Sequence, residues 1–131
     1  MKEYRMNVVR TFKEHVELTP HQARLLDWTV GLSGEAGEVS ELIKHHIYGK
    51  EELNKMELAK EIGDVMWYLT ALAETAGIHI EDVLELNTAK LAHRHGAKYC
   101  AKASKERHAK EEKFEQTEIY AAIRKRILGE E

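Results

Sequence analysis

Four acidic residues, in two short motifs, are the part of this sequence best suited to chemistry. Glu35 and Glu38 lie three residues apart, which on a helix places their carboxylates on adjoining positions of one surface. Glu61 and Asp64 repeat this spacing later in the chain. If two antiparallel helices brought the motifs face to face, the like charges would repel, and a cation would be needed to offset the repulsion. Hard divalent cations with oxygen ligands do this, and Mg²⁺ takes a few carboxylates together with substrate phosphate oxygens.

The alternative is that both motifs are solvent-exposed helix faces, the usual location of charged residues. The glycines around Glu35 favour a functional interpretation. Gly34 and Gly37 stand where a sequence selected only for helix stability would have alanine, which suggests that something packs or binds close to the backbone. We therefore treat the two acidic motifs as a candidate metal site.

A later segment carries polar residues in a pattern that suits phosphate. Asn87 falls on the otherwise apolar face of a predicted helix, and Lys90 and Arg94 follow it at helical spacing. An amide, an ammonium and a guanidinium on one strip are well suited to phosphate oxygens. The structural alternatives are a buried Asn with its amide satisfied and an exposed basic face, which is the more common arrangement.

The elements that would position these residues are all predicted to be helices. Apolar residues recur at helical spacing through most of the chain, and Thr19-Pro20 with Gln22 has the form of a capping box. We expect helices over residues 3–16, from Pro20 to a stop at Gly49, from the end of the polar connection 50–55 to Gly77, and from Ile80 to about Gly96. The sequence leaves open whether the second of these is one helix or two, broken near Gly31.

The composition agrees with one all-α domain. The chain has 131 residues, 43% of them hydrophobic and 33% charged, with one proline and 7% aromatic residues, which suits a helical bundle of four to five helices better than a β-sandwich. We expect a single domain over residues 1–131, with 108–131 as a C-terminal helical extension. The short apolar stripe of that extension predicts either a tail helix or a partner-binding one.

Charge, hydropathy and cysteine content argue against several classes of function. Twenty Lys and Arg against 23 Asp and Glu give a net charge of −3, so we expect no nucleic-acid binding. No apolar stretch approaches the ~20 residues of a membrane span, and we expect no membrane partner. The single cysteine, Cys100, cannot form an internal disulfide, which favours a reducing, cytoplasmic location.

The eight histidines do not form a recognisable metal motif. Neither the Glu-x-x-His pattern of di-iron bundles nor the His-Glu-x-x-His pattern of zinc enzymes occurs, so iron and zinc catalysis are disfavoured. His45 and His46 lie near a predicted helix end, where a partial positive charge is favourable without any function.

The acidic motifs and their surroundings resemble a known enzyme family. The segment 31–41, GLSGEAGEVSE, followed by 61–69, EIGDVMWYL, is similar in order and spacing to the MazG-like nucleoside triphosphate pyrophosphohydrolases of the all-α NTP pyrophosphatase superfamily. The segment 87–94, NTAKLAHR, looks like the Asn-x-x-Lys-x-x-x-Arg segment of the same family. The similarity covers roughly residues 4–107.

This resemblance implies that the protein converts a nucleoside triphosphate, ribo- or deoxy-, into the monophosphate and pyrophosphate, with clearance of non-standard nucleotides as one purpose. It implies that Mg²⁺, or Mn²⁺ in its place, is held by Glu35, Glu38, Glu61 and Asp64, and that the chain forms a homodimer or homotetramer. We expect Glu38 to activate the attacking water. The substrate-binding candidates are Lys44, Trp67, Tyr68, Asn87, Lys90 and Arg94. For the aromatic residues, core packing is the favoured alternative.

Two rival functions remain open at the level of sequence. A narrower enzyme of the same superfamily, dUTPase-like or hydrolysing phosphoribosyl-ATP, would share the fold and the metal site, because substrate choice depends on the shape of the pocket. A helical interaction module without enzymatic activity would use the acidic stripes only as solvent faces. That module would show no specific response to Mg²⁺.

Overall fold

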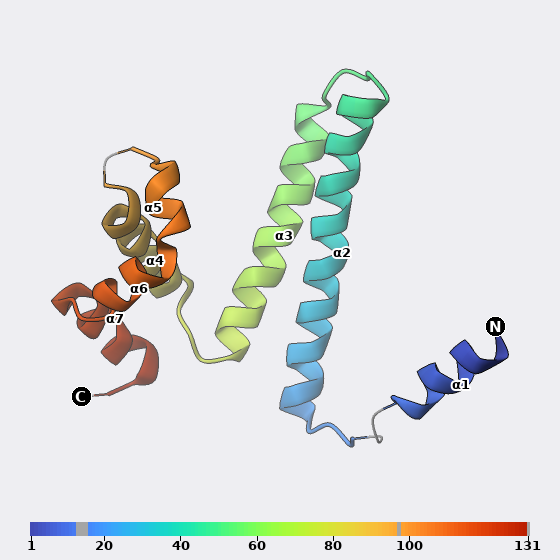
Figure 1. The fold of residues 1–131 in the computed structure, drawn as a ribbon, viewed down its shortest axis with the longest axis horizontal. Coiled ribbons are helices and arrows are strands. Elements are labelled where there is room, and N and C mark those ends of the chain that lie inside the picture. Colours follow the sequence, from blue (N-terminus) through green and yellow to red (C-terminus); the bar gives the residue numbers. More distant parts are fainter. Residues whose placement is uncertain (13–15, 97, 131) are drawn as a thin grey trace.

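The computed structural model describes residues 1–12, 16–96 and 98–130. These residues form α-helices and no strand, as the sequence predicts (Figure 1). The helices are α1 (Lys2–Arg10), α2 (Pro20–Tyr48), α3 (Lys55–Thr75), α4 (Ile80–His95), α5 (Ala101–Lys105), α6 (Arg107–Phe114) and α7 (Glu118–Leu128). The described residues thus contain more helices than the expected four to five, because the chain after Gly96 folds into three short ones.

The long helices α2 and α3 form an antiparallel hairpin (Figure 1). The predicted capping box starts α2, since the hydroxyl of Thr19 accepts from Gln22 N and the Gln22 side chain accepts from Thr19 N. The helix continues without a break to its cap at Gly49, which answers the question that the sequence left open. Helix α3 is capped by Asn54, whose side chain accepts from Glu57 N at 3.1 Å.

The first helix is shorter than the sequence predicts. It ends at Arg10, whereas the prediction ran to residue 16; of the residues beyond, 13–15 lie outside the described part, and Val16 is not helical. The backbone N–H of Thr11 turns back to the carbonyl of Val8, and its hydroxyl donates to the same oxygen. The apolar stripe of α1 is exposed, so tertiary packing does not extend the helix.

Helices α4 to α7 form a second group, which contains the buried residues of the described chain. Phe114 of α6 and Ile123 of α7 are buried, and Ile123 is 0% exposed. Arg126 of α7 binds two acidic residues of α4: its Nε donates to Asp82 at 2.7 Å, and its Nη2 donates to Glu85. The C-terminal segment therefore packs back on α4.

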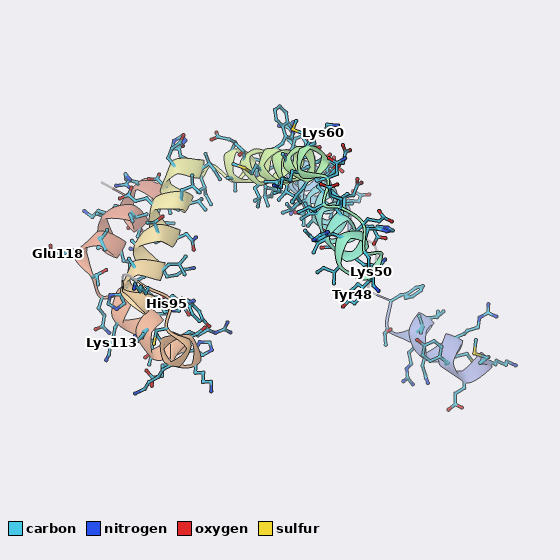
Figure 2. The ribbon with its side chains drawn as sticks, turned by 90° about the horizontal axis from the view of Figure 1, so that it is seen from above. Tyr48, Lys50, Lys60, His95, Lys113 and Glu118 are labelled. Carbon is cyan, nitrogen blue, oxygen red and sulfur yellow. The ribbon has the colours of Figure 1, made fainter. Side chains whose placement is uncertain are left out.

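The hairpin and the C-terminal group differ in how much of their surface they bury. Over the full described lengths of α2 and α3, no residue is buried. In both views the hairpin stands apart from α4–α7, with Lys60 in one group and His95 and Lys113 in the other (Figures 1 and 2). Within the described residues, no helix combines the length and the apolar character needed to cross a membrane.

One close approach fixes how α2 and α3 meet. A Cβ added at Gly31 would lie 2.1 Å from Cε1 of Tyr68, so only glycine leaves room for this ring. Tyr68 also packs against Trp28, with ring centroids 6.1 Å apart, and the indole N–H of Trp28 donates to Thr75 at 2.9 Å. These contacts join the first half of α2 to the second half of α3.

We therefore expect Gly31→Ala to destabilise the protein by about 1–3 kcal/mol, because the new methyl group must displace the Tyr68 ring. The matched control is Gly34→Ala, three residues along the same helix, where no described atom lies within 4 Å of the added Cβ. The control should gain up to about 1 kcal/mol from improved helix propensity. Urea denaturation of the three proteins measures both effects, and equal stability of the two variants would contradict the role of Gly31.

Candidate functional site

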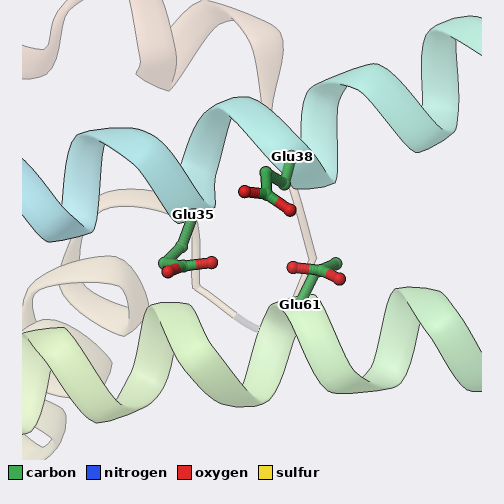
Figure 3. A group of neighbouring side chains, drawn as sticks. All are labelled: Glu35, Glu38 and Glu61. Carbon is green, nitrogen blue, oxygen red and sulfur yellow. The ribbon is translucent and has the colours of Figure 1, made fainter.

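Three of the four predicted metal ligands converge between α2 and α3 (Figure 3). Glu35 and Glu38 project from α2 at a spacing of three residues, and Glu61 faces them from α3. One carboxylate oxygen from each residue lies within 4.8 Å of the other two. Glu35 and Glu61 are half-buried and Glu38 is exposed. We call these three residues the acidic cluster.

The acidic cluster is a crowded set of like charges. The pKa of Glu61 is raised above its usual value, first by partial burial and then by the neighbouring carboxylates, with Glu38 the strongest among them. The neighbouring carboxylates thus disfavour ionisation of Glu61 when no counter-ion is present. Oxygen-only donors at this separation are the chemistry that a hard divalent cation accepts, so the residues present fit such an ion.

Asp64, the fourth predicted ligand, lies outside the acidic cluster. It is exposed on α3, one turn beyond Glu61, and its charge contributes to the raised pKa of Glu61. The glycines of the first motif also differ from the close packing that the sequence suggested. A Cβ at Gly34 or Gly37 would meet no described atom within 4 Å, so no described part of the chain covers this backbone.

A hollow of about 410 Å³ adjoins the acidic cluster. Its lining residues come from both helices of the hairpin: Glu38, Glu41, Leu42, His45, Glu57 and Glu61. Glu41 accepts from the ammonium of Lys44 with both oxygens at 2.9 Å and lies 3.0 Å from Nε2 of His45. These contacts lower the pKa of Glu41, with the Lys44 hydrogen bond as the largest cause.

The position of His45 in this hollow is the feature that the sequence analysis missed, because it treated this residue only as part of a helix end. The signal was its spacing. Glu38, Glu41 and His45 lie at i, i+3 and i+7 and therefore share one face of α2. Lys44, predicted to bind phosphate, is 60% exposed and is held by Glu41.

The two aromatic candidates have different environments. Trp67 is 71% exposed on α3, although the sequence favoured core packing for it. Tyr68 is half-buried between Gly31 and Trp28, where it packs in the hairpin. Tyr68 therefore has a packing role in this structure, while Trp67 presents its ring to solvent.

The polar strip of α4 is not joined to the acidic cluster within the chain. Asn87 is exposed and Lys90 is half-buried, whereas Arg94 is held by Glu111 of α6 at 2.5 Å. Because α4 stands apart from the hairpin, these predicted phosphate-binding residues and the acidic cluster occupy separate parts of the described chain (Figure 1).

Comparison with known proteins gives two findings about sequence. Residues 25–98 match the MazG nucleotide pyrophosphohydrolase domain. Gene 37 protein of Mycobacterium phage L5 is 37% identical over 70 residues, which are 50% of this chain and 61% of that protein, so the similarity spans less than two thirds of the phage protein. No solved structure matches the chain significantly.

The matched region contains the whole acidic cluster, both helices of the hairpin from residue 25 onward, and the polar strip of α4. It leaves out α1 and the helices α5 to α7. Since the match covers more than half of the sequence, the chain belongs to the MazG nucleotide pyrophosphohydrolase family.

Proposed function

We propose that this protein hydrolyses nucleoside triphosphates, ribo- or deoxy-, to the monophosphate and pyrophosphate, with Mg²⁺ as the cofactor. The observation that carries the proposal is the convergence of Glu35, Glu38 and Glu61 within the region that matches the family. An interaction module would not require three carboxylates to approach one another, because mutual repulsion opposes the arrangement.

We assign the metal to the acidic cluster together with Asp64, whose charge already acts on Glu61. Mg²⁺ suits this set because it binds through few carboxylates and retains positions for water and phosphate oxygens, and Mn²⁺ can take its place. The bound ion would neutralise charge on the phosphate oxygens. The protein's own contribution is to hold the carboxylates at the required separation.

We assign to Glu38 the activation of the water that attacks between the α and β phosphates. Glu38 is the exposed member of the acidic cluster and also lines the adjoining hollow, so its carboxylate can reach both a bound ion and a solvent molecule. We assign contacts with phosphate oxygens to Lys44 on α2 and to Asn87, Lys90 and Arg94 on α4, which lies apart from the acidic cluster within the chain. Trp67, whose ring is exposed, would contact the base, and Tyr68 would join it only by leaving its packing against Gly31 and Trp28.

A homodimer or homotetramer would bring these residues together and cover the hairpin. Ile62, Met66 and Leu69 form an apolar stripe along α3, and each is between 42% and 60% exposed. Leu26 and Val30 add exposed apolar surface on α2. A hairpin with no buried residue can complete a four-helix bundle by pairing with the hairpin of a second copy.

The metal assignment predicts the behaviour of Glu61→Gln. The pKa of Glu61 is raised in the folded protein, so its ionisation lowers the free energy of unfolding. This loss of stability develops as the pH rises from the usual carboxylate pKa through the raised one. Without divalent cations, the variant should therefore melt at a higher temperature than the wild type at neutral pH. It should also lose the increase in melting temperature that Mg²⁺ gives the wild type, whereas Glu74→Gln, on the exposed end of α3, should keep that increase.

Activity is tested with the pure protein, Mg²⁺ and a panel of ribo- and deoxynucleoside triphosphates that includes dUTP, together with phosphoribosyl-ATP. Monophosphate and pyrophosphate should appear, and Glu38→Gln should lower the rate at least about 100-fold while the protein stays folded. Asp27→Asn, an exposed acidic residue on the same helix, is the control and should retain the wild-type rate. Hydrolysis of only dUTP or phosphoribosyl-ATP would identify a narrower enzyme. No product from a folded wild-type protein would refute the proposal.

The oligomer is tested by size-exclusion chromatography with light scattering. The wild type should elute as a dimer or tetramer, and Met66→Glu should shift it toward the monomer, because the new carboxylate would be buried in the shared bundle. Ile119→Glu places the same charge on an exposed apolar residue of α7 and should leave the mass unchanged. A monomeric wild type would contradict a bundle completed between copies.

A further inference from the structure

The arginine that we assign to substrate phosphate is already bound to a carboxylate of the C-terminal extension. Arg94 Nη2 donates to Glu111 Oε1 at 2.5 Å, and the two side chains are only 15% and 34% exposed. A charge-assisted hydrogen bond with this little exposure is screened less by solvent than a surface ion pair is. Any other anion that binds this guanidinium must therefore displace Glu111 or share the charge with it.

Neighbouring contacts hold α6 against the last turn of α4. The ammonium of Lys110 donates to the backbone carbonyl of Arg94 at 2.9 Å. The ring of Phe114, which is buried, lies against that of His93, with centroids 5.8 Å apart. Glu111 sits between these two contacts along α6, so its position at Arg94 is fixed by the helix on both sides.

The interaction leaves Arg94 incompletely satisfied. Among the described residues, Arg94 Nε is the one buried side-chain donor or acceptor without a hydrogen-bond partner. Guanidinium groups bind carboxylates and phosphates best through two parallel N–H donors, whereas in the described structure Arg94 donates one hydrogen bond to Glu111, from Nη2. A phosphate group, with more acceptor oxygens, can engage the unused donor and is the better ligand once it gains access.

We propose that Glu111 is an internal competitor for substrate phosphate at Arg94, so that α6 acts as an autoinhibitory clamp on nucleotide binding. The proposal rests on the function proposed above. The Glu111 carboxylate and a phosphate group compete for the Arg94 guanidinium, because both are anions and repel each other when they bind the same small cation. Since α6 lies outside residues 25–98, the clamp belongs to the extension and not to the matched domain.

The expected size of the effect follows from the fraction of molecules in which the clamp is open. If Glu111 holds Arg94 in about nine molecules of ten, the apparent dissociation constant for a phosphate ligand is raised about tenfold. Glu111→Gln removes the negative charge and keeps the side-chain shape. This variant should therefore bind a phosphate chain about tenfold more tightly than the wild type.

The experiment measures binding by calorimetry with two probes, each in the presence of Mg²⁺. One probe is α,β-methylene-dATP, which lacks the cleavable bond, and the other is inorganic triphosphate, which has no base or sugar. Glu112→Gln is the matched control, because it removes the same charge from an adjacent, exposed position. The double variant Arg94→Gln/Glu111→Gln is compared with Arg94→Gln alone, and a thermal melt verifies that each variant is folded.

Tighter binding of both probes by Glu111→Gln but not by Glu112→Gln supports the clamp, provided that the gain disappears in the Arg94→Gln background. Equal affinities of Glu111→Gln and Glu112→Gln, in a wild type that hydrolyses nucleotides, overturn the clamp alone. Weaker binding together with a lower melting temperature shows a purely structural ion pair and also overturns it. If the folded wild type neither binds nor hydrolyses any probe or nucleotide tested, the proposed function itself fails.

Discussion

The repulsion among Glu35, Glu38 and Glu61 is the constraint on which the site depends. Three carboxylates within 4.8 Å must be held together by forces that arise elsewhere, because their own interaction drives them apart. The contact of the Tyr68 ring with Gly31 and the hydrogen bond from Trp28 to Thr75 lie toward the end of the hairpin where α2 begins and α3 ends, and they fix how the two helices meet. Packing in one part of the hairpin thus maintains a strained arrangement of charges in another.

The hairpin buries little surface, so the exposed apolar stripe of Ile62, Met66 and Leu69 on α3 is available to pack against another part of the protein or a second copy. The C-terminal group buries Phe114 and Ile123, whereas α2 and α3 bury no residue over their described lengths. Two helices in contact along one side cannot remove all of their apolar surface from water, and a second hairpin is the simplest structure that would do so. The same association would surround the acidic cluster with more low-dielectric material, which would strengthen the attraction between its carboxylates and any bound cation.

The sequence predicted local features well and the arrangement of helices poorly. Helix α2 followed from the capping box at Thr19 and the stop at Gly49, and α4 followed from its apolar period, because both signals depend on neighbouring residues only. Spacing showed that Glu61 could approach Glu35 and Glu38 if the two helices formed an antiparallel hairpin, and the family resemblance implied that they share a metal; the structure brings these three together and leaves Asp64 outside the group. A helical extension over residues 108–131 was expected, and α6 and α7 lie in that range. The short helix α5 before it and the packing of the extension on α4 were not expected, because the burial of Phe114 and Ile123 depends on contacts with α4 that spacing does not reveal.

The physical competition at Arg94 links the family's domain to the extension that follows it. The Arg94 guanidinium is only 15% exposed, so leaving it without an anion would be costly. Glu111 meets this requirement in the structure, where it accepts one hydrogen bond from Arg94, and Arg94 Nε has no partner among the described residues. In the proposed clamp, one of the contacts that hold the extension on α4 is the one that a phosphate chain would displace, and a stronger clamp would bring stability at the expense of nucleotide affinity.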